Sequence, residues 1–206
     1  MATSKLMKKT ENFFTTLKQL GTSGKEGTTF LVKDKQGKEY AMKTFRKTKS
    51  PKTLEKEALL QIQASKKRVC PKVHSYDIKK KHIVMDKMDF HLTELIQRQK
   101  NSLTKIQQER ILEIYQKLDE AKVFHNDSNI NNYMVRRGRI YIIDFGFSKE
   151  ITAALCKNLK TERPNYILMT IGFIMEAKRF FKNCPKIYDH ILKSVSKENA
   201  KKYGLL

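Results

Sequence analysis

The stretch VFHNDSNINNYMVRRGRIYIIDFGFSKE, residues 123–150, places three oxygen-bearing side chains around one predicted turn. Two β-rich runs flank the turn RRGR at residues 136–139, which predicts a hairpin. Asp127 and Asn132 precede this hairpin and Asp144 follows it. Because a hairpin brings its two ends together, we expect these three side chains to converge.

Two carboxylates and one amide offer only oxygen ligands. Such a set suits a hard cation such as Mg²⁺, which takes few protein ligands and leaves room for phosphate oxygens. The three residues therefore predict phosphoryl transfer. The alternative, in which Asp127 is a turn residue and Asn132 caps the chain locally, explains each residue singly and leaves their combination unexplained.

The motif HND at residues 125–127, Asn132 five positions after Asp127, and DFG at 144–146 resemble the catalytic loop and the metal-binding motif of the protein kinase superfamily. The resemblance implies that Asp127 accepts the proton of the attacking hydroxyl. It also implies that Asn132 and Asp144 bind Mg²⁺ and that Asp144 links the metal to the phosphates of ATP. His125 is expected to pack beneath this loop.

The first third of the chain offers the phosphate-binding parts that such a site needs. The segment LGTSGKEGTTFLV contains Gly21, Gly24 and Gly27, and YAMK places Lys43 in a predicted strand sixteen residues after the last glycine. The resemblance implies that the glycine-rich turn covers the phosphates and that Lys43 reaches them. One residue more separates the first two glycines than in the pattern G-x-G-x-x-G.

In an active kinase the strand lysine pairs with a glutamate on the next helix, and this chain offers Glu55 and Glu57. Leu54, Ala58, Leu59 and Ile62 define the apolar face of the predicted helix, and Glu55 falls within the same arc. The pattern E-x-x-A-L-L also resembles the corresponding helix of compact atypical kinases. We therefore predict that Glu55 pairs with Lys43, with Glu57 as the alternative.

The resemblance also implies an adenine site between the two halves of the chain. The segment HIVMDKM, residues 82–88, is similar to the last front-lobe strand and hinge of kinases. Met85 would lie at the back of the pocket, and backbone groups of Asp86 and Met88 would contact the adenine edge. Side chains expected to enclose the ring are those of Leu20, Thr29, Ala41 and Met134.

The order of predicted elements indicates an α+β fold, with a β-rich first part and a helical second part. The ranges predicted as strands are 27–34, 39–45, 72–78 and 82–88, and those predicted as helices are 50–67, 91–99, 105–121, 166–181 and 185–199. By resemblance this is one two-lobed, protein kinase-like domain over residues 1–206. Its N-lobe would span about residues 12–86 and its truncated C-lobe about residues 89–206.

Several features depart from an ordinary kinase. After DFG only 60 residues remain and they contain no A-P-E, so a long activation segment is missing. Asn126 stands where kinases carry arginine, and Asn129 stands where protein-directed kinases carry a lysine; Lys149 could compensate. The truncation resembles the small atypical kinase of the KEOPS tRNA-modification complex, and casein-kinase-like viral enzymes are a second possible relation.

The net charge and the cysteine content of the chain indicate which partners and which compartment to expect. The formal net charge is +22, which favours polyanionic partners such as nucleic acid or a nucleic-acid-associated complex. Three scattered cysteines give no disulfide framework, so we expect a reducing, intracellular location in cytoplasm or nucleus. The run YILMTIGFIM is about half the roughly 20 residues that a membrane span needs, and MATSKLMKKT lacks the apolar region of a secretory signal.

These observations lead to three expectations for function. The first is an ATP- and Mg²⁺-dependent kinase that phosphorylates serine or threonine hydroxyls of protein substrates. The second is an ATPase like the KEOPS kinase, which serves tRNA modification within a complex. The third is a catalytically inactive scaffold that binds nucleic acid, against which the presence of Lys43, Asp127, Asn132 and Asp144 argues.

Overall fold

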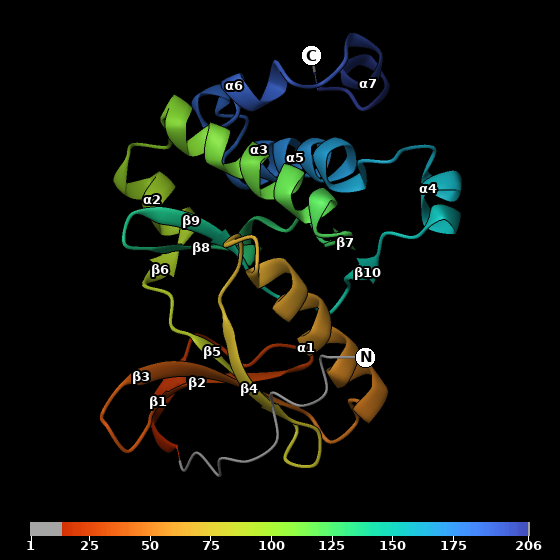
Figure 1. Ribbon diagram of the computed structural model, residues 1–206. Coiled ribbons are helices and arrows are strands. Elements are labelled where there is room, and N and C mark those ends of the chain that lie inside the picture. Colours follow the sequence, from red (N-terminus) through yellow and green to blue (C-terminus); the bar gives the residue numbers. More distant parts are fainter. Residues whose placement is uncertain (1–13, 206) are drawn as a thin grey trace.

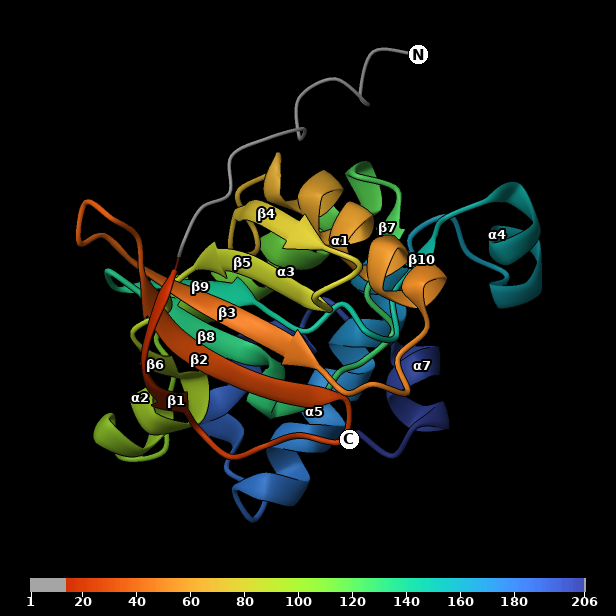
Figure 2. The same cartoon turned by 90° about the horizontal axis from the view of Figure 1, so that it is seen from below.

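The computed structural model describes residues 14–205; residues 12 and 13 of the predicted N-lobe and residue 206 of the predicted C-lobe lie outside this range. The first part of the chain forms a five-stranded antiparallel sheet in the order β1-β2-β3-β5-β4 (Figures 1 and 2). Its strands are β1 Thr15–Leu20, β2 Gly27–Lys33, β3 Glu39–Phe45, β4 Val73–Asp77 and β5 His82–Asp86. Four of these strands match the predicted ranges, whereas β1 was not predicted.

Helix α1, Pro51–Ser65, packs against this sheet. The Ser50 side chain accepts a hydrogen bond from the Thr53 N–H at 3.1 Å, and Pro51 occupies the first turn, where its missing N–H costs nothing. The helix and the sheet share a small apolar core of Phe45, Leu54, Ala58, Val73 and Ile83. We call β1–β5 and α1 the front lobe.

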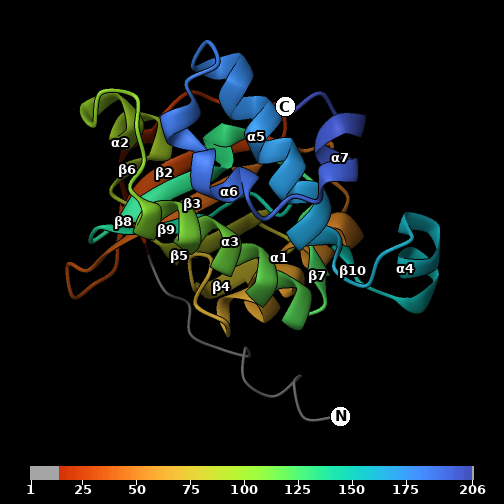
Figure 3. The ribbon, with the colours of Figure 1, turned by 90° about the horizontal axis from the view of Figure 1, so that it is seen from above.

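The remaining elements form a mostly helical back lobe with its own, larger core (Figures 1 and 3). Its longer helices are α2 Leu92–Arg98, α3 Lys105–Glu120, α4 Ala153–Leu159 and α5 Thr170–Phe180. A hairpin of β8 Tyr133–Arg136 and β9 Arg139–Ile142 pairs with β6 Phe90–His91, and β7 Val123–Phe124 pairs with β10 Lys149–Glu150. The predicted α+β class and the predicted hairpin are confirmed.

Three predictions about the back lobe need correction. The helix expected over 185–199 is broken into a 3₁₀ turn Pro185–Ile187, α6 Asp189–Leu192 and α7 Lys197–Lys202. The break occurs because Ser196 is extended and its side chain accepts the Asn199 N–H, which starts a new helix. The helix expected over 166–181 begins as a π-helix, Asn165–Met169, and only then continues as α5. Helix α4 was not predicted, and it stands away from the rest of the back lobe in Figures 2 and 3.

Several contacts connect the two lobes. The Asp86 carboxylate at the end of β5 pairs with Arg136 of β8 at 2.7 Å. In the segment that connects the lobes, the Asp89 side chain accepts a hydrogen bond from the Arg137 N–H at 2.8 Å. The Arg110 guanidinium donates to the Arg68 carbonyl at 2.9 Å. These contacts hold the front sheet against the β8–β9 hairpin.

No helix within residues 14–205 combines the length and the apolar character required to cross a membrane. The longest helix, α3, has 16 residues, and its exposed residues include the charged Lys105, Glu109 and Glu120.

Candidate functional site

The loop that carries Asp127 is fixed to the segment before Asp144 by a buried histidine. His125 is fully buried, and its Nδ1 and Nε2 lie 3.0 Å from the carbonyl oxygens of Asp127 and Ile143. Burial lowers the pKa of His125 below its ordinary value, so the ring is neutral at pH 7 and its single N–H donates to one carbonyl at a time. His125 is therefore structural, as the sequence predicted.

A second link joins Asn132 to the same segment. The Ile143 N–H donates to the Asn132 carbonyl at 2.8 Å, directly before Asp144. The Asn132 side chain is buried, and its amide nitrogen forms no hydrogen bond with any group in residues 14–205. Together with the histidine links, this bond brings the segments of Asp127, Asn132 and Asp144 side by side, as the hairpin prediction required.

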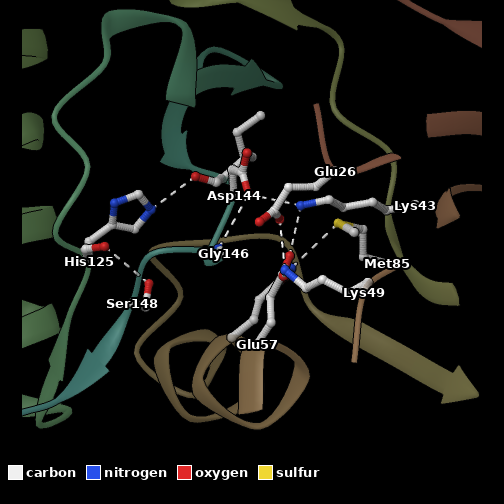
Figure 4. A network of polar contacts seen from close by, with 11 residues as sticks. Glu26, Lys43, Lys49, Glu57, Met85, His125, Asp144, Gly146 and Ser148 are labelled. Atoms are coloured by element: carbon white, nitrogen blue, oxygen red, sulfur yellow. Dashed lines mark hydrogen bonds and ion pairs between the residues drawn. The ribbon is translucent and has the colours of Figure 1, made fainter. Parts of the chain in front are cut away.

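Asp144 lies where the two lobes meet. Its backbone has a φ of +65°, a left-handed conformation that is costly for a residue with a side chain and that concentrates at functional sites. Its Oδ1 accepts a hydrogen bond from the Gly146 N–H at 3.3 Å and lies 2.8 Å from Nζ of Lys43 (Figure 4). The Lys43 contact joins residues 101 positions apart, so it forms only when the two lobes pack together.

Lys43 also pairs with the helix α1, through Glu57 and not through the predicted Glu55. Its Nζ lies 2.7 Å from Glu57 Oε1, and the Glu57 side chain is only 2% exposed. Glu55 is exposed. The prediction was wrong because it placed Leu59 on the buried face, whereas Leu59 is 49% exposed and the buried face runs through Leu54, Glu57, Ala58, Gln61 and Ala64.

In the cluster of Lys43, Glu57 and Asp144, the opposite charges stabilise each other's ionised forms. Burial alone would lower the pKa of Lys43, but the carboxylates of Glu57 and Asp144 more than offset this, and the pKa is raised. Burial alone would raise the pKa of Asp144, but the Lys43 ammonium and the Gly146 N–H lower it overall. Both groups are therefore charged across the physiological range.

The glycine-rich segment lies next to this cluster. Gly21 has a φ of +68°, and the Gly24 N–H donates to the Gly27 carbonyl at 2.8 Å. A Cβ on Gly27 would lie 2.1 Å from the Thr44 carbonyl oxygen of β3. Gly27 is thus required for the close approach of β2 and β3, beyond any role in phosphate binding. The phosphate contacts of the three glycines stay a prediction.

The residues predicted to bind adenine lie around the end of β5. Ala41 is buried and lies opposite Met85 in the sheet, and Met134 is half-buried on β8. The N–H of Asp86 donates to the Lys72 carbonyl, which leaves only its carbonyl for adenine. The Met88 N–H forms no backbone hydrogen bond within the described residues, so it is free to donate. These geometries are compatible with the predicted adenine site and do not test it.

The donor set at the site fits a hard cation. Asn132 and Asp144 offer an amide oxygen and a carboxylate, the ligand types that Mg²⁺ takes together with phosphate oxygens. The Asn132 amide nitrogen has no hydrogen-bond partner within residues 14–205, so no bond from this nitrogen fixes the orientation of the amide. Of the two Asp144 oxygens, only Oδ1 contacts Lys43. These two residues could therefore hold the metal.

Sequence reasoning missed the residues that support the loop of Asp127 from the π-helix. The Asn165 side-chain oxygen accepts a hydrogen bond from the backbone N–H of His125 at 2.9 Å. The Asn165 side-chain nitrogen donates to the Asp119 carboxylate at 2.7 Å and to the Val123 carbonyl at 2.8 Å. Asp119 also accepts the N–H groups of Asn165 and Tyr166. A buried asparagine some forty residues from the loop gave no local signal, although π-helices occur often at functional sites.

A glycine of α5 also supports this loop. A Cβ on Gly172 would lie 2.2 Å from Oγ and 2.6 Å from Cβ of Ser128. The loop that carries Ser128 can therefore pack this closely on α5 only because residue 172 is glycine.

The two departures from the kinase pattern have structural counterparts. Asn126 has a φ of +63°, a conformation that asparagine tolerates well, and its amide donates to the Phe147 carbonyl after the DFG motif at 3.3 Å. Asn129 is exposed and its side chain caps the turn that leads to Asn132. Lys149, predicted as a substitute for the missing lysine, is exposed on β10, and the substitution stays a prediction.

A cavity of about 730 Å³ lies apart from these residues, between Lys122 and α4. None of its lining residues belongs to the predicted site; besides Lys122 they are Ile151, Thr152, Ala153, Cys156, Lys157, Lys160, Thr161 and Glu162. Its carboxylate and lysines lack the asparagine–aspartate pair that phosphoryl transfer needs, so we place the functional site at Lys43 and Asp144.

The family model of the protein kinase domain matches residues 14–168 of the chain. The matched range contains every candidate site residue named above. Comparison with curated proteins gives no match.

Proposed function

Since the chain belongs to the protein kinase domain family, it is a kinase-type phosphotransferase that uses ATP, and we propose that it phosphorylates serine or threonine hydroxyls of proteins with Mg²⁺ as its metal. The observation that carries this proposal is the pair of contacts from Lys43 to Glu57 at 2.7 Å and to Asp144 at 2.8 Å. These contacts assemble groups from both lobes around one position.

Each part of the site has a role in this proposal. Asp127 would accept the proton of the attacking hydroxyl, and Lys43 would neutralise charge on the phosphates of ATP. Asn132 and Asp144 would hold Mg²⁺, which supplies further neutralisation of the phosphate charge when bound. Phosphoryl transfer depends mainly on positioning and charge neutralisation, so this small set of groups is sufficient.

The adenine would lie between the sheet and the hairpin. Ala41 and Met85 would contact the ring from the front lobe and Met134 from the back lobe, while the Asp86 carbonyl and the Met88 N–H would contact its edge. The free Met88 N–H supports this placement.

Incubation of the purified protein with γ-labelled ATP and Mg²⁺ tests the proposal. Protein substrates with serine or threonine should become labelled, and Asp127→Asn and Asp144→Asn should each abolish the labelling. Equal labelling by the wild-type protein and both variants would refute the assignment of the site.

A second candidate function is ATP hydrolysis within an RNA-modification complex. The net charge of +22 favours this candidate, because it attracts polyanions by long-range steering. The absence of A-P-E after DFG, a feature by which the sequence resembles the KEOPS kinase, adds to this candidate. ATP turnover that rises on addition of tRNA, without transfer of label to protein, would favour this candidate over the first. An intracellular location stays a prediction for both.

A further inference from the structure

Lys49 is a second buried lysine next to the proposed nucleotide site, and its sequence context gives no hint of a role. It lies between β3 and α1, and its side chain is only 8% exposed. Its Nζ lies 2.8 Å from Glu26 Oε2 and 3.0 Å from Glu57 Oε2, and 5.3 Å from the centre of the Phe45 ring (Figure 4). The contact with Glu57 Oε2 is close enough for an ion pair, but its angles do not meet those of a hydrogen bond.

Lys43 and Lys49 therefore approach the same carboxylate from two sides. Lys43 contacts Glu57 Oε1 and Lys49 contacts Glu57 Oε2, and both ammonium groups lie near the ring of Phe45. One glutamate cannot neutralise two ammonium groups. Each lysine consequently has a further carboxylate partner, which is Asp144 for Lys43 and Glu26 for Lys49.

The partner of Lys49 comes from the glycine-rich segment. The Arg46 N–H donates to the Glu26 carbonyl at 2.9 Å, and the Arg46 guanidinium donates to the Gly24 carbonyl at 3.2 Å. These bonds fold the segment onto the end of β3. The Glu26 side chain points toward Lys49 and Asp144 (Figure 4).

The Glu26 carboxylate thereby lies among the groups that would surround the phosphates of ATP. Its Oε2 is 2.8 Å from the position that a Cβ on Gly146 would occupy. Carboxylate oxygens of Glu26, Glu57 and Asp144 all lie within 4.8 Å of one another. Three carboxylates so close together repel, and the two lysines between them offset this repulsion only in part.

We propose that Lys49 is a second phosphate-binding lysine of the nucleotide site, and that Glu26 occupies the phosphate position until ATP replaces it. This inference rests on the proposed function. A phosphate oxygen would take the place of the Glu26 carboxylate beside Lys49, and the glycine-rich segment would move to release Glu26. Lys49 would keep Glu57 as a partner throughout, so it would remain oriented.

Lys49 would also supply the charge that the catalytic loop lacks at Asn129. Lys149, the candidate predicted from the sequence, is exposed on β10 and pairs through its backbone with Phe124. Lys49, in contrast, has a side chain that is only 8% exposed, and it contacts Glu57, the carboxylate that also pairs with Lys43.

Calorimetric titration with ATP·Mg²⁺ and, separately, with adenosine tests this proposal, because adenosine carries no phosphate. Lys49→Met keeps the length of the side chain against Phe45 and should weaken ATP binding about tenfold, the effect expected for loss of one charged contact. Glu26→Gln should strengthen ATP binding about threefold, because it removes the competing carboxylate. Adenosine binding should stay unchanged in both variants, and Lys49→Arg should bind ATP within about threefold of wild type.

The opposite directions of the two effects separate this proposal from a purely structural ion pair. If Lys49 and Glu26 only stabilised the fold, both substitutions would weaken ATP and adenosine binding alike. Such a parallel loss would overturn the proposal. Unchanged ATP affinity in Lys49→Met would also overturn it, and so would weaker ATP binding in Glu26→Gln. Thermal unfolding of every variant shows whether the fold is retained, and Glu26→Gln decides the matter if Lys49→Met does not fold.

Lys43→Met serves as the control for the proposed function itself. If Lys43→Met loses ATP affinity and Lys49→Met does not, only the inference on Lys49 fails. If the wild-type protein binds no ATP, the nucleotide site and the inference fail together.

Discussion

The two halves of the candidate site are built in different ways. In the back lobe, the segments of Asp127, Asn132 and Asp144 are joined by short, buried hydrogen bonds through His125, Asn165 and the main chain. In the front lobe, Lys43, Glu57, Lys49 and Glu26 are joined by ion pairs between charged side chains, two of which are also hydrogen bonds.

This difference has a physical consequence. Neutral buried hydrogen bonds fix the backbone, and breaking one leaves an unsatisfied polar group. Ion pairs between long side chains can exchange partners when another anion, such as a phosphate, arrives. We therefore expect the back half of the site to be rigid and the front half to rearrange with its ligand.

Gly172→Ala should have the largest effect, because it acts on the rigid half. The added Cβ would meet Ser128 at 2.2 Å and displace the loop that carries Asp127. A displacement of about 1 Å at a catalytic group can cost about 100-fold in rate, and we expect a loss of that order in phosphoryl transfer.

The double variant Gly172→Ala with Ser128→Gly provides the control. It removes both Ser128 atoms that the new methyl group would meet, and alanine is otherwise favourable in a helix. Most of the lost activity should return relative to Ser128→Gly alone. If it does not return, contact with Ser128 is not the reason for this glycine.

Glu57→Gln should have the next largest effect, since it removes the charge shared by Lys43 and Lys49. Loss of a charged contact of this kind corresponds to about 30-fold in kcat/KM for ATP. Glu55→Gln, on the exposed side of the same helix, is the matched control and should change kcat/KM less than twofold. Equal losses in the two variants would show that α1 is rotated differently in the active protein.

Arg136→Met should have a smaller effect, because it removes one half-exposed ion pair between the lobes. Arg136 pairs with Asp86 at 2.7 Å, and His74 remains as a second partner of Asp86 at 2.8 Å. We expect KM for ATP to rise about threefold with little change in kcat. Arg137→Met should leave KM unchanged, because Arg137 contacts Asp89 through its backbone N–H only; an equal rise there would argue against a role for the Asp86 pair.

Glu113→Gln should change stability and leave activity intact, because Glu113 lies on α3, outside the site. Burial alone would raise the pKa of Glu113, but Lys117 and Arg110 lower it to about 2. A lowered carboxyl pKa stabilises the fold above its ordinary value of 4.5, and this contribution is lost as the pH falls toward about 2. Because the side chain is partly exposed, we expect a loss of about 1 kcal/mol in the free energy of unfolding at pH 7.

Denaturant unfolding at several pH values measures this contribution. The difference between Glu113→Gln and the wild type should shrink between pH 4.5 and pH 2. Glu94→Gln, at an exposed pair within α2, should show little difference at any pH. A difference for Glu113→Gln that is independent of pH would contradict the ionic origin.

The same contrast explains which parts of the site could be predicted from the sequence. Asp127, Asn132 and Asp144 lie within 18 residues of one another, so one predicted hairpin was enough to bring them together. Glu57 depended on the rotation of a helix, and the exposed Leu59 gave a false phase. Asn165 and Gly172 act on the loop from some forty residues away through packing that no local pattern encodes.

The fold shows a similar limit. The β3 and β5 strands, α1, α3 and the β8–β9 hairpin follow from hydrophobic periodicity and turn residues. Strand β1 is exposed at the edge of the sheet and lacks an apolar face, so its pattern carries little signal. The short helices after residue 184 are interrupted by serine capping, which competes with the amphipathic pattern.

A crystal structure of the protein with Mg²⁺ and a non-hydrolysable ATP analogue tests the central claim most directly. We predict phosphates beside Lys43, a metal ion held by Asn132 and Asp144, and adenine between Ala41 and Met134. A nucleotide bound elsewhere, such as in the cavity beside α4, with Lys43 and Asp144 still paired to each other, would contradict the account.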